Sequence, residues 1–142
     1  MAQSVREVMT ENPIVLPVNA SVQDAAVRMR DQKIGDIIVE KNGALFGMVT
    51  DRDIVVRVVA EGKDARATDL ESICSRDLVT LAPEDSVKDA SRVMEEHAVR
   101  RLPVVEGGSN GKIIGILSLG DIATEKKPKS ALGKISAAAA NT

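Results

Sequence analysis

The sequence predicts an α/β (α+β) fold in which two copies of one β-α-β-β-α unit pack sheet to sheet about a pseudo-two-fold axis. The first observation is an internal repeat that runs through most of the 142-residue chain. The second is that apolar residues in each copy alternate between the spacing of strands and that of helices. The third is size: half of such a chain buries too little surface to be stable alone, so the two halves are expected to share a core.

The repeat is clearest in two nine-residue stretches, "SVQDAAVRM" at 21–29 and "SVKDASRVM" at 86–94. They are identical at five of nine positions and lie 65 residues apart. After an insertion in the second copy, at "GGSNG", the stretch "GMVTDRDI" matches "GILSLGDI" at an offset of 68. We therefore expect the first copy at 1–66, the second at 67–127, and a low-complexity tail at 128–142.

Each copy is expected to begin with a short helix, near Ser4 in the first copy and near Asp69 in the second. A short strand follows at 14–16 and at 79–81, where apolar residues match between the copies. These lead-in regions have the same order in both halves, which extends the repeat to the start of the chain.

The longer helix of each copy is predicted to start at Ser21 and at Ser86. Each serine is followed three residues later by an aspartate, as in a capping box, and apolar residues then recur at intervals of three and four. Two strands follow, joined by the turn sequences "KNG" and "GGSNG". A second helix closes each copy, beginning after Thr50 and after Ser118.

The composition argues against several classes of protein. The formal net charge is −2, so no basic field would attract a nucleic acid duplex or an anionic membrane. One Phe and no Trp or Tyr leave few platforms for stacking single-stranded bases. Cys74 has no partner for an internal disulfide, and the N-terminus lacks the apolar core of a signal peptide. We expect a soluble cytoplasmic protein with no nucleic acid or membrane partner.

Two short motifs, Thr50-x-x-Asp53 and Ser118-x-x-Asp121, occur where a strand is predicted to turn into a helix. The simpler interpretation is structural, because Thr and Ser are good N-caps and Asp suits the positive end of a helix. The other is functional, because a carboxylate at the open end of a strand can accept two hydrogen bonds from a ribose diol, and a helix start binds polar groups. The two interpretations are compatible.

The stretches "GMVTDRDI", "GILSLGDI" and "HAVRRLPVV" resemble the signature of the CBS motif, and two such motifs in tandem resemble a Bateman module. The resemblance covers residues 1 to about 125. It is greatest to the group of small stand-alone bacterial CBS-pair proteins that includes the mycobacterial hypoxic response protein. It implies that an adenosine-containing ligand such as AMP, ADP, ATP, NAD or S-adenosylmethionine binds in clefts between paired sheets. It also implies a sensor rather than a catalyst, and dimerisation through helices.

The resemblance further implies two sets of ligand-binding residues, each drawn from both copies. The first set contains Asp121, Ser118, Arg101 and Ile116, with Ile14, Ile34 and Gly35 from the other copy. The second set contains Asp53, Thr50 and Met48, with Val79, Val99 and Arg100 from the other copy.

In the implied first set, Asp121 would bind ribose and Arg101 would bind phosphate through its forked guanidinium. Apolar side chains would sandwich the adenine, although core packing is their simpler role. The first copy has Asp36 in the place of Arg101, and a carboxylate there would repel a phosphate. That half-site is expected to be empty, or to bind adenosine with little phosphate, unless Arg100 compensates from the other copy.

The sequence therefore predicts a non-catalytic sensor that requires no cofactor and binds an adenine nucleotide or S-adenosylmethionine. The alternative is a ligand-free structural or protein-interaction CBS pair. His97 is a single histidine without a partner for metal binding or catalysis, and Cys74 is expected to be buried. The apolar run at 54–59 leaves little polar face, so it predicts a homodimer centred on this helix, with an unknown protein as a possible further partner.

Overall fold

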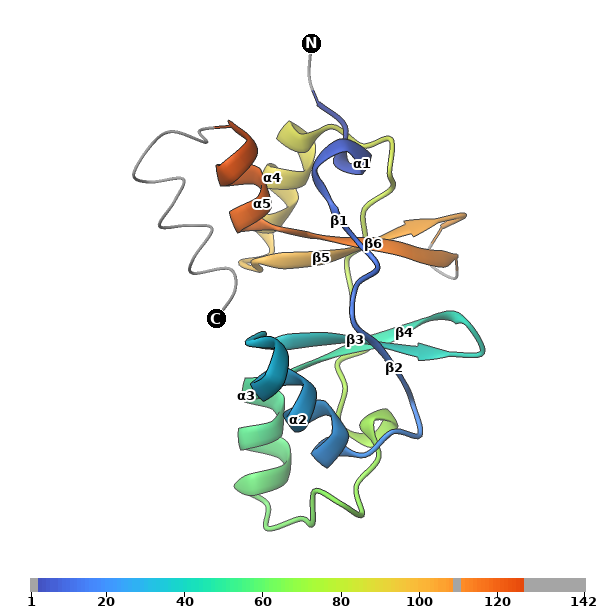
Figure 1. Ribbon diagram of the computed structural model, residues 1–142, viewed down its shortest axis with the longest axis vertical. Helices are drawn as coiled ribbons and strands as arrows, with labels where there is room; N and C mark the ends of the chain where they lie inside the picture. Colours follow the sequence, from blue (N-terminus) through green and yellow to red (C-terminus); the bar gives the residue numbers. More distant parts are fainter. Residues whose placement is uncertain (1–2, 109–110, 127–142) are drawn as a thin grey trace. The chain divides into compact units, whose positions relative to one another are not determined.

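The computed structural model describes residues 3–108 and 111–126, so the expected tail at 128–142 lies outside the described residues (Figure 1). The chain divides into two compact units. Unit 1 combines Met1–Pro13 with Val79–Thr142, and unit 2 is the continuous stretch Ile14–Leu78. The α/β class and the repeated β-α-β-β-α order are both confirmed, with one incomplete strand described below.

Unit 2 contains a three-stranded sheet with its helices. Strand β2 lies parallel to β3, and β3 lies antiparallel to β4. Asn42 and Gly43 join β3 to β4, both with positive φ, as a type I′ hairpin turn requires. The elements are β2 (Val15–Pro17), α2 (Val22–Gln32), β3 (Asp36–Lys41), β4 (Ala44–Thr50), α3 (Asp51–Ile54), the π-helical turn η1 (Val55–Val59) and the 3₁₀ turn η2 (Leu70–Ser72).

Unit 1 has the same hairpin and helices, but a different strand pairs with its hairpin. Strands β5 and β6 form an antiparallel hairpin, and the two-residue strand β1 pairs antiparallel with β6. The elements are α1 (Val5–Val8), β1 (Thr10–Glu11), α4 (Val87–Glu96), β5 (Arg101–Glu106), β6 (Lys112–Ser118) and α5 (Leu119–Lys126).

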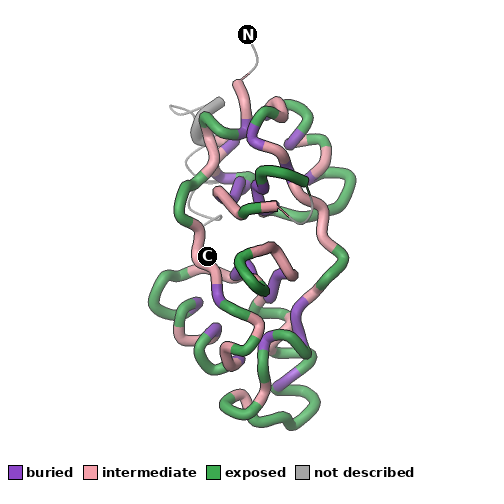
Figure 2. Tube along the Cα trace, turned by 90° about the vertical axis from the view of Figure 1, so that its right-hand side faces the viewer, coloured by how far each residue is buried: buried purple, intermediate pink, exposed green. Residues whose placement is uncertain are grey.

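The two longer helices start where the sequence predicts. The Ser21 hydroxyl accepts a hydrogen bond from the Asp24 amide, and the Ser86 hydroxyl accepts one from the Asp89 amide, both at 3.0 Å. Each helix buries one face against the strands of its own unit, so buried positions recur along one side of each helix and along the strands (Figure 2). Each unit therefore has its own apolar core.

The strand expected at 79–81 is reduced to a single bridge between Leu81 and Val104. In unit 2, the amides of Ile38 and Val18 extend the equivalent pairing by donating to the carbonyls of Ile14 and Glu40. Their counterparts in the second copy are Pro103 and Pro83. Because proline has no N–H, both of these hydrogen bonds are lost, and the second copy cannot form the full strand.

The two lead-in segments, defined here as residues 4–11 and 69–76, each pack in the unit that contains the other copy's helices and hairpin. Val5 from the start of the chain is fully buried in the unit 1 core. Leu70 and Ile73, which precede the second copy, are buried in the unit 2 core. Unit 1 is therefore assembled from segments far apart in the sequence, whereas unit 2 is continuous.

Glycines allow the lead-in segments to cross the hairpins closely. A Cβ at Gly115 would lie 2.6 Å from the Met9 sulfur and 2.9 Å from the Thr10 carbonyl oxygen. A Cβ at Gly47 would lie 2.5 Å from the Ser75 carbonyl oxygen. These separations are too short for a side chain, so both positions require glycine for the backbone to approach.

Candidate functional site

The junction between β6 and α5 in unit 1 is shaped by a reciprocal pair of hydrogen bonds. The Ser118 amide donates to Asp121 Oδ2 at 3.0 Å, and the Asp121 amide donates to Ser118 Oγ at 3.0 Å. Ser118 is only 4% exposed, so these bonds form largely out of water. The predicted capping role of both residues is confirmed, and it fixes the position of the Asp121 carboxylate at the helix start.

A third group reaches the same carboxylate from the first lead-in segment. The Thr10 hydroxyl donates to Asp121 Oδ2 across 3.4 Å, and Thr10 lies opposite Ile116 in the β1–β6 pairing. The Thr10 hydroxyl and the Ser118 amide therefore donate to the same carboxylate oxygen. Sequence reasoning missed Thr10. The signal was present, because its counterpart in the repeat is also a hydroxyl residue, Ser75.

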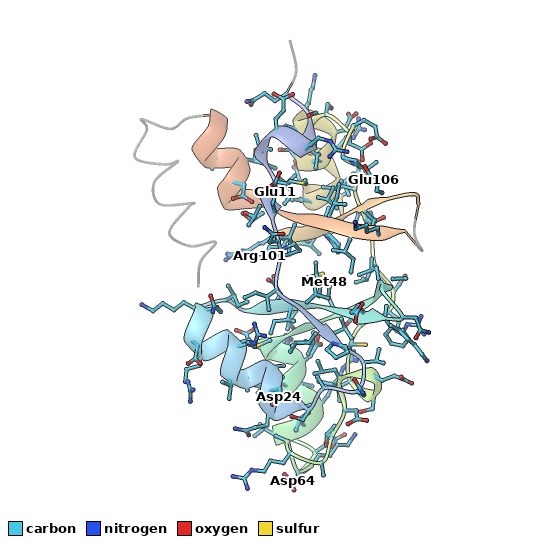
Figure 3. All side chains as sticks on the ribbon, turned by 45° about the vertical axis from the view of Figure 1, so that its right-hand side comes forward. Glu11, Asp24, Met48, Asp64, Arg101 and Glu106 are labelled. Carbon is cyan, nitrogen blue, oxygen red and sulfur yellow. The ribbon has the colours of Figure 1, made fainter. Side chains whose placement is uncertain are left out.

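The arginine pair adjoins this junction through the backbone. Arg101 lies directly opposite Ser118 in the β5–β6 pairing, and the Leu119 amide donates to the Arg100 carbonyl at 2.8 Å. Arg101 stands at one end of β5 and Glu106 at the other (Figure 3). The structure thus brings Asp121, Ser118 and Arg101 to one end of the unit 1 hairpin.

The β4–α3 junction of unit 2 has the same pair of reciprocal hydrogen bonds, but a different residue lies on the adjacent strand. The Thr50 amide donates to Asp53 Oδ2 at 2.9 Å, and the Asp53 amide donates to Thr50 Oγ1 at 3.0 Å. The Asp51 amide donates to the Gly35 carbonyl at 2.9 Å, matching the bond at Arg100. Asp36 lies opposite Thr50, in the register position that Arg101 holds in unit 1.

The second junction also carries a cation that the sequence analysis overlooked. Arg57 Nε lies 3.9 Å from Asp53 Oδ1, and Arg57 Nη1 donates to the Ile73 carbonyl at 3.0 Å. The Asp53 side chain is 14% exposed, so its carboxylate is largely enclosed. The residue at the equivalent place in the second copy is Glu125. The sequence of the second copy therefore has an acidic residue where the first copy has Arg57.

Among the apolar residues expected at the ligand, Ile14, Ile34 and Val79 pack against the core of a unit, whereas Met48, Ile116 and Val99 belong to neither core. Met48 and Ile116 are buried in their strands. Val99 is 37% exposed, next to the arginine pair. Ile14 and Ile34 pack against the unit 2 core and Val79 against the unit 1 core, as ordinary packing would require. The pairing of residues from opposite copies in one ligand site stays a prediction.

The remaining polar candidates are accounted for by the fold. His97 caps the C-terminal end of α4 and is exposed. Cys74 is buried as predicted, and burial raises the pKa of its thiol, so the thiolate is disfavoured at neutral pH. Across residues 3–108 and 111–126, no group of three or more His, Cys, Asp or Glu side chains is arranged to hold a metal ion. Nor does any helix in these ranges have the length and apolar character needed to cross a membrane.

Comparison with known proteins defines the class. The CBS domain family model matches residues 5–60 and again residues 70–127. The chain therefore belongs to the CBS domain family and carries two CBS domains in tandem, which confirms the resemblance seen in the sequence. CBS pairs are typically regulatory modules that bind adenosine ligands and are not themselves catalytic.

Individual relatives and solved structures match this chain over most of their own length. The CBS domain-containing protein YhcV of Bacillus subtilis is 37% identical over 130 residues, which cover 92% of this chain and 90% of YhcV. The crystal structure of Hypoxic Response Protein I with two coordinated zinc ions is 30% identical, with a TM-score of 0.77, and the match covers 85% of this chain and 97% of that one. The crystal structure of the CBS domain pair of protein MJ0100 was solved in complex with 5′-methylthioadenosine and S-adenosyl-L-methionine. It is 23% identical to this chain, with a TM-score of 0.78, and the match covers 92% of this chain and 100% of the MJ0100 pair, which shows the shared fold.

Proposed function

We propose that this protein is a sensor that binds an adenosine-containing ligand at the Asp121 junction of unit 1. The observation that supports this most strongly is the state of the Asp121 carboxylate. Both the Ser118 amide and the Thr10 hydroxyl donate to its Oδ2, which fixes the carboxylate at the start of α5. A positioned carboxylate has two acceptor oxygens, which suits the two hydroxyls of a ribose.

The charges beside this carboxylate favour a ligand that also carries phosphate. Arg101 begins the strand that pairs with the strand ending at Ser118, and Arg100 precedes it with its carbonyl bonded to the helix start. Guanidinium groups bind phosphate oxygens with paired, charge-assisted hydrogen bonds. AMP, ADP and ATP therefore fit the unit 1 junction better than S-adenosylmethionine, which has no phosphate.

The same reasoning makes Asp53 the weaker half-site. Its carboxylate already faces the guanidinium of Arg57, and Asp36 stands where Arg101 stands in unit 1. A ribose at Asp53 would compete with an ion pair, and a phosphate would meet a carboxylate. We propose that one nucleotide binds per chain at Asp121, with Ile14, Ile34 and Gly35 as the expected contributors from the first copy.

We also propose that the protein forms a homodimer through α3 and η1. Val58 is buried in the unit 2 core, but Val55, Val56 and Val59 on the same turn are 58%, 47% and 67% exposed. Three exposed valines on one helical turn form an apolar surface that water disfavours. A second copy of the chain covers it. Sedimentation of the wild type as a dimer at micromolar concentration, and of Val56→Asp as a monomer, is the expected result.

One observation favours the alternative, a CBS pair that binds no ligand and acts through protein contacts. Asp36 makes the unit 2 junction unsuited to an anion, and loss of one half-site is a step toward loss of both. Under this alternative, the Asp121 carboxylate only caps α5. The two functions differ in one measurable respect, which is whether any adenine nucleotide binds.

The test is isothermal titration calorimetry of the full chain with AMP, ADP, ATP and S-adenosylmethionine. Asp121→Ala removes the proposed ribose acceptor, and Asp53→Ala is the matched control, because it removes the same capping carboxylate from unit 2. We expect one nucleotide per chain, loss of binding in Asp121→Ala, and little change in Asp53→Ala. No binding of any of the four ligands by the folded wild type would favour the ligand-free alternative.

A further inference from the structure

Each of the two lead-in segments packs against a hairpin, and the repeat makes the two arrangements equivalent position by position. The segment at 4–11 contacts the β5–β6 hairpin, and the segment at 69–76 contacts the β3–β4 hairpin. The Thr10–Ile116 pairing in unit 1 corresponds to the Ser75–Met48 bridge in unit 2. Each hairpin thus offers a docking surface that is similar in backbone to the other.

An ion pair joins each lead-in segment to the hairpin on which it docks. The positive charge lies on the lead-in segment in unit 1 and on the hairpin in unit 2. In unit 1, Arg6 Nη2 of the lead-in lies 2.9 Å from Glu106 Oε2 at the end of β5. In unit 2, Lys41 Nζ at the end of β3 lies 3.7 Å from Glu71 Oε1 of the lead-in. At the offset of 65, Arg6 corresponds to Glu71 and Glu106 to Lys41. In the second copy, the lead-in segment therefore has a negative charge where the first has a positive one, and the hairpins differ in the opposite sense.

A second contact distinguishes the two segments. Arg76 stacks on the ring of Phe46, with its guanidinium carbon 3.6 Å from the ring centroid, and its Nε donates to the Phe46 carbonyl at 3.2 Å. The equivalent residue of the first segment is Glu11, which cannot make a cation–π contact. The equivalent of Phe46 is Ile114, which has no ring.

We propose that this reversal of charge sorts the two lead-in segments, so that each docks only on the hairpin of the other copy. Exchanging the segments would place Arg6 beside Lys41 and Glu71 beside Glu106. Two attractive pairs would become two repulsive ones. All four side chains are about half exposed, so each contact is weak, but both reversals act in the same direction.

Sorting is needed because the repeat otherwise leaves the choice open. The buried apolar residues of the two segments are similar, with Val5 in one and Leu70 in the other, and burial of similar side chains does not discriminate strongly between the two surfaces. A wrong docking could involve the same chain or a second copy during folding. Charge is the property in which the two segments differ most.

The test reverses the segments and then the surfaces, in the full chain. The double variant Arg6→Glu/Glu71→Lys keeps the net charge but makes both native dockings repulsive. Adding Lys41→Glu and Glu106→Lys restores attraction with the opposite polarity. We expect the double variant to lose about 5 °C in Tm at low salt, and the quadruple variant to recover most of this loss. The loss should shrink in 1 M NaCl, because salt screens exposed charges.

A matched control and a position readout separate sorting from simple stabilisation. Arg28→Glu/Glu61→Lys makes the same charge exchange at exposed residues that form no ion pair within the described part of the chain, and should leave Tm unchanged. Zero-length carbodiimide crosslinking reports which segment is docked. In the wild type, Lys41 should link to Glu71. In the double variant, a link between positions 6 and 41 is expected. In the quadruple variant, the link should again join positions 41 and 71, now between a glutamate and a lysine.

Two results would overturn the proposal. A double variant as stable as the control would show that the ion pairs do not contribute to docking. A destabilised double variant without a link between positions 6 and 41 would show that the charges stabilise the native docking without choosing the segment. Neither readout depends on a nucleotide, so the proposal is independent of the function proposed for Asp121.

Discussion

The two strand–helix junctions have the same backbone frame but different chemical surroundings. Ser118 with Asp121, and Thr50 with Asp53, make the same two reciprocal hydrogen bonds. In unit 1, the third group at the carboxylate is the neutral Thr10 hydroxyl, whereas in unit 2 it is the Arg57 guanidinium. The comparison teaches that the capping interaction preserves the position of a carboxylate, while its neighbours decide whether that carboxylate is available to a ligand.

The largest effect is expected from reversing the charge of Arg101, the first residue of β5. Arg101→Asp gives unit 1 the charge that unit 2 has at Asp36. It should weaken ATP binding at least 100-fold, or about 3 kcal/mol, because charge-assisted hydrogen bonds are lost and a repulsive carboxylate is added. Calorimetry with ATP and adenosine checks this, since adenosine carries no phosphate and should lose much less. Equal losses for both would indicate a folding defect.

The next effect concerns the glycines beneath the two lead-in segments. Gly47→Ala should lower the free energy of unfolding by about 2 kcal/mol, because its Cβ would meet the Ser75 carbonyl at 2.5 Å, and backbone moves at greater cost than a side chain. Gly115→Ala should lower it by about 1 kcal/mol, because its shortest contact is with the flexible Met9 side chain, and its backbone contact, with the Thr10 carbonyl oxygen, is longer at 2.9 Å. Urea unfolding of both variants measures the difference, and a larger loss at Gly115 would contradict it.

A smaller effect is expected at the hydroxyls of the lead-in segments. Thr10→Val removes the donor to Asp121 while keeping the shape, and should weaken nucleotide binding about fivefold, or about 1 kcal/mol. Ser75→Ala is the matched change in unit 2 and should leave affinity unchanged. If both variants bind as the wild type does, the Thr10 contact has no part in positioning the carboxylate.

The smallest effect is expected at Arg57. Arg57→Gln should release Asp53 and strengthen nucleoside binding at unit 2 by no more than a few fold, because Arg57 is half exposed and its interaction with Asp53 is screened by water. Adenosine at high concentration should then show a second binding event in calorimetry, with Asp53→Ala/Arg57→Gln as the control that abolishes it. Unchanged stoichiometry would show that Asp36, rather than Arg57, limits this half-site.

Much of the fold could be predicted because the repeat supplied each local signal twice. The starts of α2 and α4 at Ser21 and Ser86 follow from side-chain capping, which depends on neighbours within a few residues. The strand expected at 79–81 failed for a non-local reason. The hydrogen bonds that it lacks would come from Pro103 and Pro83, and only the strand pairing shows that these residues are the required donors.

In the candidate site too, features local in the sequence could be predicted and contacts between distant residues could not. The Asp121 and Asp53 motifs were visible in the sequence because their residues are three apart. Thr10 and Arg57 were not recognised, since Thr10 lies 111 residues from Asp121, and Arg57 looks like an ordinary polar residue in an apolar helix. Contacts of this kind depend on which segment docks where, and the exchange of the lead-in segments could not be read from the repeat itself.

The discontinuity of unit 1 has a consequence for biosynthesis. Because a chain emerges from the ribosome N-terminus first, Ile14–Leu78 can condense from residues that are already consecutive. Residues 4–11 must wait, because the hairpin that receives them is completed only when Ser118 has been made. A nascent chain therefore carries Val5 unburied until β6 has been made, and unit 1, the later of the two units to form, captures a segment that was synthesised before unit 2.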